Sequence, residues 1–161
     1  MKYLNSYKVF ENTDYSFFDN QTFYGNVIYR GISNDELKYY KDKGRLGYFF
    51  SESLPFANDY GDIIIEAKLT TNNVFNSHDP REIKKLYDNG FILSDKYEDV
   101  DYITYEDYIE NGSESDTWDV IENSGVLDWI LSEYDVCYIS EGGIGNFYIE
   151  DSKFIEVVNI K

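Results

Sequence analysis

The chain has 161 residues, 42% of them hydrophobic and 19% aromatic, which is enough to bury one sizeable core, and we predict a single domain spanning residues 1–161. No segment approaches the roughly 18 uncharged apolar residues of a membrane span, and the first residues lack the apolar run of a secretory signal. The composition therefore predicts a cytoplasmic protein without a membrane partner. The single cysteine, Cys137, lies in a strand-like run and is expected to be a buried apolar side chain rather than a nucleophile.

The acidic residues are unevenly distributed along the chain. The formal net charge is −17, and residues 97–152 hold 16 Asp or Glu with no Lys or Arg, which leaves 15 acidic and all 14 basic residues elsewhere. Such a surface repels the phosphate backbone of nucleic acids, so no direct nucleic-acid binding is expected. It could attract a basic protein surface or imitate DNA towards a DNA-binding protein. The alternative is an acidic surface that only keeps the protein in solution.

Predicted strands and helices alternate in the first half of the chain. The aromatic and β-branched run Phe23–Arg30 predicts a strand. The run Ser33-Asn34-Asp35-Glu36 has the form of a capping box, which predicts a helix from Asn34 to Lys43 that Gly44 ends. Three further elements follow: a strand at Gly47–Ser51, a short helix that Ser53 caps and Pro55 begins, and a strand at Asp62–Leu69.

The second half begins with a helix and ends with strands. Asp79 and Pro80 predict a helix start, and Gly90 predicts its end. In the acidic region we predict short helices near 104–110, 117–122 and 126–134, the last with an apolar stripe that should pack on the core. The remaining expected elements are a strand at Val136–Ser140, a glycine-rich turn at Glu141–Asn146, and closing strands at Phe147–Ile149 and Ile155–Ile160. The pattern indicates an α+β fold.

Residues 29–62 combine three kinds of side chain that a dinucleotide site uses: a cation, hydroxyl groups and aromatic faces. Together they can hold a pyridine dinucleotide in a fold that lacks a glycine-rich phosphate loop. The chain has no such loop, and it has no set of Cys and His residues for zinc, so no metal site is expected. The side chains concerned are Arg30, Phe50, Ser51, Ser53 and Tyr60.

These motifs and their order resemble a known enzyme family. Tyr29-Arg30-Gly31, then Phe49-Phe50-Ser51-Glu52-Ser53, then a helix with Ala57 and Tyr60 and a hydrophobic strand resemble the NAD-binding half of ADP-ribosyltransferases. The late run 138–150 is similar to the acidic loop and strand of that superfamily. More narrowly, the run 44–50, Trp118 and the loop at Glu141 resemble the small anti-CRISPR ADP-ribosyltransferases of phages.

The resemblance implies a fold and a function. The fold would be α+β, with an ADP-ribosyltransferase-like split antiparallel β-sheet core and peripheral helices. The function would be NAD+-dependent mono-ADP-ribosylation of a host protein in the host cell cytosol, as a phage counter-defence. NAD+ is then the substrate, and the target is a basic or nucleic-acid-binding host protein. The acidic half of the chain favours a protein acceptor over nucleic acid.

The resemblance also assigns roles to individual residues. Glu141 or Glu150 would be the catalytic acid, which favours the positive charge that develops on the ribose; we prefer Glu141 because it ends a strand and two glycines follow it. Arg30 would hold phosphate through its guanidinium, and a strand-edge salt bridge is the alternative. Ser51 would support the nicotinamide ribose.

The aromatic residues have weaker assignments. Tyr60 and Phe50 could stack on nicotinamide, although Phe50 is also expected in the core. By strand alternation Tyr29 should point away from Arg30 and stay outside the site. Ser53 is better explained as a helix cap.

Three features depart from the family pattern: Glu52 replaces a small hydroxyl residue, no Glu-x-Glu pair marks arginine as the acceptor, and Gly142-Gly143 could be a plain hairpin turn. A second hypothesis is therefore a non-catalytic acidic inhibitor that imitates DNA and binds a DNA-binding defence protein. A third is an enzyme that hydrolyses NAD+ and releases free ADP-ribose. The acceptor residue and the oligomeric state cannot be predicted from these motifs.

Overall fold

The computed structural model describes residues 14–44, 47–95, 100–103, 105–108 and 117–161. Its centre is a seven-stranded sheet with the strand order β4-β7-β8-β2-β1-β3-β9, accompanied by a two-stranded sheet of β5 and β6. Only the β4–β7 pair is parallel among the described ladders, so the predicted α+β class with a mostly antiparallel sheet is confirmed. The strands are β1 Val27–Ile32, β2 Phe49–Ser51, β3 Ile63–Leu69, β4 Val74–Asn76, β5 Leu93–Asp95, β6 Val100–Ile103, β7 Val136–Glu141, β8 Ile144–Tyr148 and β9 Ile155–Ile160.

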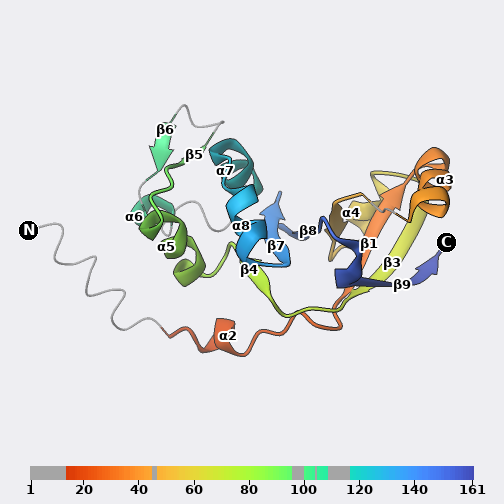
Figure 1. Cartoon of the computed structure of the whole chain (residues 1–161), viewed down its shortest axis with the longest axis horizontal. Coiled ribbons are helices and arrows are strands. Elements are labelled where there is room, and N and C mark those ends of the chain that lie inside the picture. Colours follow the sequence, from red (N-terminus) through yellow and green to blue (C-terminus); the bar gives the residue numbers. More distant parts are fainter. Residues whose placement is uncertain (1–13, 45–46, 96–99, 104, 109–116) are drawn as a thin grey trace, which may run out of the picture.

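The helices gather at the two ends of the central sheet (Figure 1). Helices α5 to α8 lie with β5 and β6 at one end, whereas α3 and α4 lie with β1 and β3 at the other. The helices are α2 Ser16–Asp19, α3 Asn34–Lys43, α4 Leu54–Asn58, α5 Pro80–Asp88, α6 Tyr105–Asp107, α7 Thr117–Ser124 and α8 Leu127–Glu133, with a 3-10 turn at Ser152–Phe154. Among the described residues, no helix has the length and apolar content needed to cross a membrane.

The predicted helix boundaries rest on caps that the structure contains. The Ser33 hydroxyl accepts a hydrogen bond from the Glu36 backbone N–H, and the Glu36 carboxylate accepts one from the Ser33 N–H, which completes the capping box of α3. Gly44 ends this helix with a positive φ of 67°. Ser53 caps α4 by accepting a hydrogen bond from the Phe56 N–H, and Asp79 caps α5 by accepting one from the Arg81 N–H, as the sequence predicts.

In the middle of the sheet, β1 and β2 are joined by a single residue pair, and we call this place the weak joint. Strand β1 pairs with β3 over six residues, but it pairs with β2 only where Tyr29 lies opposite Ser51. Strand β2 continues instead into three pairs with β8. Because β1 and β2 separate on either side of this single pair, a hollow forms between the two groups of strands.

Two apolar clusters lie on opposite faces of the β4-β7-β8-β2 part of the sheet, because alternate residues of these strands belong to different clusters. One includes Ile28, Ile65 and Phe147 and packs under β1, β3 and β8; the other includes Ile83, Ile121 and Ile130 and packs α5, α7 and α8 against β7. Cys137 belongs to the second cluster and is fully buried, which confirms the expectation, and burial raises the pKa of its thiol.

The sequence analysis missed several short elements. Strands β4, β5 and β6 and helix α2 were not predicted, and β8 begins at Ile144 inside the segment expected to be a turn. The turn is limited to Gly142 and Gly143, which have φ values of 57° and 76° and connect β7 directly to β8. In the predicted helix 104–110, Tyr105–Asp107 form α6, Tyr108 follows it, and residues 104, 109 and 110 lie outside the described part.

Candidate functional site

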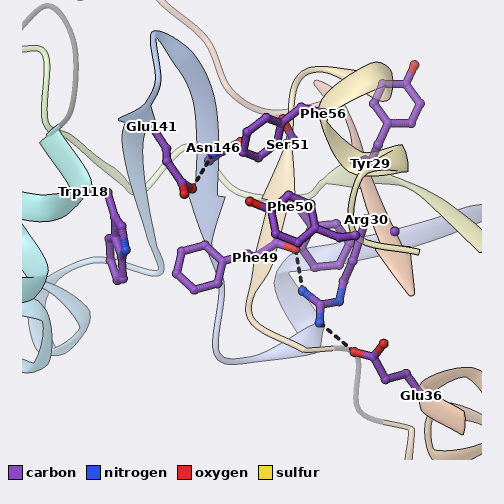
Figure 2. A pocket seen from close by; sticks show the side chains of 13 residues that line it. Tyr29, Arg30, Glu36, Phe49, Phe50, Ser51, Phe56, Trp118, Glu141 and Asn146 are labelled. Atoms are coloured by element: carbon purple, nitrogen blue, oxygen red, sulfur yellow. Dashed lines mark hydrogen bonds and ion pairs between the residues drawn. The ribbon is translucent and has the colours of Figure 1, made fainter. Parts of the chain in front are cut away.

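A pocket of about 340 Å³ lies at the joint between β1 and β2. Five separate segments of the chain line it: β1, α3, β2 with α4, the start of α7, and the hairpin of β7 and β8 (Figure 2). Five of the six predicted site residues line this pocket, namely Arg30, Phe50, Ser51, Tyr60 and Glu141. Its size lies at the lower end of the range for small-molecule sites.

Arg30 is held in place by the backbone and by an acid. Its Nη1 donates a hydrogen bond to the Phe49 carbonyl oxygen at 2.9 Å, and its Nη2 lies 3.3 Å from a carboxylate oxygen of Glu36. Gly47 packs directly against the guanidinium, so that a side chain at that position would overlap it. The Arg30 side chain is 18% exposed. Arg30 therefore forms a salt bridge, but from an interior strand to helix α3 and not at a sheet edge, and the same side chain lines the pocket.

Glu36 links the pocket to helix α3. One of its carboxylate oxygens contacts Arg30, and the other accepts the hydrogen bond from the Ser33 N–H that caps the helix. The hydrogen bond from the Ser33 backbone is the main cause of a lowered Glu36 pKa, which the Arg30 charge lowers further against the opposing effect of burial. The helix cap and the orientation of the guanidinium thus share one carboxylate.

Ser51 lies at the floor of the pocket with only 4% of its surface exposed. Its hydroxyl oxygen accepts a hydrogen bond from the Ser53 backbone N–H at 3.0 Å, and Ser53 in turn caps α4. Gly31 on β1 lies against the other end of α4, where a side chain would overlap the backbone carbonyl of Ala57. These contacts fix α4 against the sheet and place Tyr60, which follows the helix, at the pocket.

Glu141 ends β7 and enters the pocket from the side opposite β1 (Figure 2). The Asn146 side chain on β8 donates a hydrogen bond from Nδ2 to Glu141 Oε2 at 3.3 Å. Gly142 and Gly143 have positive φ values, which favour glycine in a tight turn, and a side chain added at either position would meet open space. The interpretation as a plain hairpin turn is therefore correct.

Tyr60 lies at the mouth of the pocket and is 59% exposed. Its ring packs on Phe56 with a centroid distance of 5.2 Å. Burial raises the pKa of Tyr60, and the negative charges of Glu141 and Asp59 raise it further. The effect of Glu141 on this hydroxyl indicates that the two side chains approach the same region of the pocket.

An aromatic wall, formed by Tyr48, Phe49, Trp118 and Tyr148, closes one side of the pocket. Trp118 and Tyr148 stack at a centroid distance of 5.7 Å, and Tyr48 also stacks with Tyr148, at 5.4 Å. Phe49 meets Trp118 edge-on at 4.9 Å. Phe49 and Trp118 line the pocket, so the wall presents aromatic surface to any ligand inside it.

Buried polar contacts determine where Trp118 lies. The preceding residue, Thr117, is fully buried, and its hydroxyl accepts a hydrogen bond from the Ser140 backbone N–H at 2.8 Å. The same hydroxyl lies 2.6 Å from that of Ser77. Because Ser140 directly precedes Glu141, these bonds fix the start of α7 beside the end of β7. Trp118 and Glu141 therefore reach the pocket from neighbouring backbone positions.

Two buried polar atoms in the described part of the chain lack a hydrogen-bond partner, and both belong to side chains that line this pocket. They are Arg30 Nε, a donor, and Asn146 Oδ1, an acceptor. Buried polar groups are nearly always paired in folded proteins, so unpaired ones indicate a ligand, a water molecule or a functional constraint. Two side chains that line the pocket thus each keep one unpaired polar atom, a donor on Arg30 and an acceptor on Asn146.

Glu150 and Glu52 lie elsewhere. Glu150 follows β8 and lines a second groove, which also contains Asp35 and Asp151 and shares Glu36 with the pocket. Its carboxylate accepts a hydrogen bond from the Tyr148 hydroxyl at 3.4 Å. Glu52 accepts one from the Tyr138 hydroxyl at 3.1 Å and does not line the pocket. Of the two candidate acids, the structure brings only Glu141 together with Arg30 and Ser51.

Several lining residues were not predicted. The Tyr29 side chain points away from Arg30, as strand alternation predicts, but Tyr29 still lines the pocket, where it was not expected (Figure 2). Glu36 had been interpreted only as a helix cap, and Asn146 only as part of a turn. A hairpin turn at Gly142-Gly143 would have predicted that Asn146 lies on a strand and not in a turn. In the structure this strand, β8, pairs with β2 and places Asn146 opposite Ser51. In the motif 44–50, Arg45 and Leu46 lie outside the described residues.

No protein-family model matches this chain, and no curated protein or solved structure matches it.

Proposed function

We propose that this protein is an NAD+-dependent mono-ADP-ribosyltransferase that uses the pocket between β1 and β2. One observation carries the proposal: Arg30, Ser51, Tyr60 and Glu141, predicted from distant parts of the sequence, line one pocket. The weak joint between β1 and β2 is also what a split ADP-ribosyltransferase-like sheet would contain. In this proposal NAD+ is consumed as a substrate and the acceptor is a protein.

The chemistry assigns a task to each side of the pocket. The bond between C1′ of the ribose and the nicotinamide nitrogen breaks, the electron pair leaves with neutral nicotinamide, and positive charge develops on the ribose ring. The carboxylate of Glu141 stabilises this charge and accepts a hydrogen bond from a ribose hydroxyl. A nucleophile of the acceptor protein then forms the new bond to C1′ and loses its proton.

The other residues position the substrate. Arg30 Nε has no partner, and a guanidinium binds anions through several N–H groups, so we assign the phosphates of NAD+ to Arg30. Trp118 and Phe49 supply the aromatic surface for nicotinamide, with Tyr60 at the mouth of the pocket. The sequence analysis assigned stacking on nicotinamide to Phe50 and Tyr60. Phe50 is 2% exposed and belongs to the core, so we assign stacking to Trp118 in its place.

The test is transfer of label from NAD+. The purified protein is incubated with NAD+ and a lysate of a bacterial host, and intact-mass analysis of the proteins under denaturing conditions looks for one added ADP-ribose unit. We expect the adduct with the wild-type protein and none with Glu141→Gln. Release of free ADP-ribose without any adduct would identify an NAD+ hydrolase. Failure of the protein to bind or consume NAD+ would reject the enzymatic proposal.

A specific observation favours a second candidate, a non-catalytic inhibitor that imitates DNA. Exposed acids lie on α6, α7 and α8, and the segment 97–152 that contains these helices has no Lys or Arg. The acids concerned are Glu106, Asp107, Glu122, Asp128 and Glu133. Binding through exposed charges weakens steeply as salt rises, whereas a covalent adduct survives denaturation. A complex that dissociates at high salt and leaves its partner with unchanged mass would support the inhibitor.

A further inference from the structure

The Asn146 side chain is buried with half of its hydrogen-bonding capacity unused. Only 2% of the residue is exposed. Its Nδ2 donates to Glu141 Oε2, and its Oδ1 has no partner among the described residues. The orientation of the amide follows from this contact, because an ionised carboxylate only accepts hydrogen bonds and so must face the NH2 group. The carbonyl oxygen is therefore the unpaired atom.

A second buried asparagine provides a direct comparison. Asn76 on β4 is 6% exposed, and both ends of its amide are paired. Its Nδ2 donates to Gln21 Oε1 at 2.9 Å, and its Oδ1 accepts from the His78 backbone N–H at 3.0 Å. Asn76 thus has the contacts of a structural residue. Asn146 differs from it in having an unpaired acceptor and in lining the pocket.

We propose that Asn146 is a ligand-binding residue, whose Oδ1 accepts a hydrogen bond from an N–H or O–H group of the ligand while its Nδ2 holds Glu141. A ligand donor would remove the cost of the unpaired carbonyl, which the protein alone does not remove. This inference rests on the proposed function for the identity of the ligand. In NAD+ the matching donors near the reacting bond are the carboxamide NH2 and the ribose hydroxyls.

The first test measures stability without ligand. Leucine has nearly the shape of asparagine, so Asn146→Leu removes the unpaired carbonyl at little cost in packing. The one bond that it breaks, to Glu141 Oε2, involves a half-buried residue that water can reach. We therefore expect Asn146→Leu to unfold at the wild-type temperature or above it, whereas Asn76→Leu should unfold at a lower temperature because it leaves two groups unpaired. Equal destabilisation by both substitutions would assign Asn146 a structural role and overturn the inference.

The second test measures affinity by calorimetry with NAD+ and with 3-acetylpyridine adenine dinucleotide, which keeps the ribose hydroxyls but has no carboxamide N–H. Asn146→Leu should weaken NAD+ binding about tenfold, the effect of one lost hydrogen bond, while Asn76→Leu should not change it. If the preference of the wild type for NAD+ over the analogue disappears in Asn146→Leu, the donor is the carboxamide. If both ligands weaken equally, the donor is a ribose hydroxyl. Unchanged NAD+ affinity in Asn146→Leu would overturn the inference.

The two proposals can fail separately. If the wild-type protein binds neither dinucleotide, the proposed function is wrong, and the stability comparison alone decides whether Asn146 is reserved for another ligand. If the wild type binds NAD+ and Asn146→Leu binds it equally well, the proposed function stands and Asn146 has no part in binding.

Discussion

The Arg30 guanidinium donates a hydrogen bond to the backbone carbonyl of Phe49, and this bond joins β1 to β2 beside the single residue pair of their ladder. The side chain thus supplies a connection that backbone groups would supply in a regular sheet. Its ion pair with Glu36 adds a second connection, to helix α3. The structural role and the proposed binding role of Arg30 are compatible, because Nε and further N–H groups remain for a ligand.

This arrangement predicts two effects of Arg30→Ala. Loss of the charged hydrogen bond to Phe49 should lower the free energy of unfolding by about 1.5–3 kcal/mol, measured by urea denaturation. Loss of the guanidinium should also weaken NAD+ binding about tenfold or more, measured by calorimetry. Arg30→Lys should recover part of the stability but little of the affinity, because an ammonium group cannot reproduce the planar set of donors.

The matched control is Arg81→Lys. Arg81 also pairs with acids, Asp79 and Asp19, but it lies on α5 and does not line the pocket. Its substitution should leave NAD+ affinity unchanged. If Arg30→Ala reduces stability while affinity stays at the wild-type value, Arg30 is only a structural connection between the strands.

Gly31 gives a prediction that depends on packing alone. A methyl group at this position would overlap the carbonyl of Ala57, and backbone cannot move aside as a flexible side chain can. Gly31→Ala should therefore displace α4 and lower the free energy of unfolding by about 1–3 kcal/mol, the usual cost of overpacking. The displacement should also reduce NAD+ affinity, since Tyr60 follows α4. Wild-type stability of this variant would show that α4 can shift freely.

The sequence predicted those parts of the fold that have local signals. The helix α3 was predicted from start to end because Ser33, Glu36 and Gly44 each act within one turn of the helix terminus. Strand β4 was missed because all three of its residues are buried, which gives no alternation of polar and apolar side chains. It is stabilised by pairing with β7, more than fifty residues away, and no local pattern records such a contact.

The residues of the site were also predicted only where the local sequence marks them. Arg30, Ser51 and Glu141 stand out because they are polar residues at the ends of apolar strands. Asn146 was expected in a turn and Glu36 in a helix cap, and neither local pattern reveals the contacts of these residues with Glu141 and Arg30. Glu141 and Glu150 could not be separated by sequence because both border the same hairpin strand; the side on which each lies depends on the register of β7 and β8.

Paired substitutions separate the two acids. Under the proposed mechanism, Glu141→Gln should reduce ADP-ribose transfer by about 10²–10³-fold, because the carboxylate charge that stabilises the transition state is lost. Glu150→Gln should retain wild-type transfer, since Glu150 lines a different groove. Circular dichroism and the unfolding temperature would verify that both variants fold. Loss of transfer in Glu150→Gln with full transfer in Glu141→Gln would reverse the assignment.

The aromatic wall gives a direct signal for binding. The chain has two tryptophans, of which Trp118 lines the pocket. The other, Trp129, lies on α8, packs against Phe91 and does not line the pocket. In the variant Trp129→Phe, the fluorescence of the remaining Trp118 should fall as NAD+ is added, because nicotinamide would contact its ring. Trp118→Phe should show no such change and should bind NAD+ more weakly, by about 1 kcal/mol of lost aromatic contact. Quenching of Trp129 in the Trp118→Phe variant would place the ligand elsewhere.

The last prediction concerns pH and the Glu36 carboxylate. Its pKa in the folded protein lies below its ordinary value of 4.5, chiefly because the Ser33 N–H donates to the ionised form. A depressed pKa means that ionised Glu36 stabilises the fold, that this contribution is complete above pH 4.5, and that it is lost as the pH falls through the folded-state pKa. Glu36→Gln should therefore be less stable than the wild type at pH 7, and the difference should shrink in acid.

Urea denaturation of both proteins at a series of pH values checks this expectation. Glu133→Gln is the control, because Glu133 is exposed on α8 and has no ion-pair partner among the described residues. Its difference from the wild type should stay small throughout the series. A Glu36→Gln deficit that persists undiminished at the lowest pH would mean that the charge of Glu36 contributes nothing, and that the deficit arises from the fit of the side chain between Ser33 and Arg30.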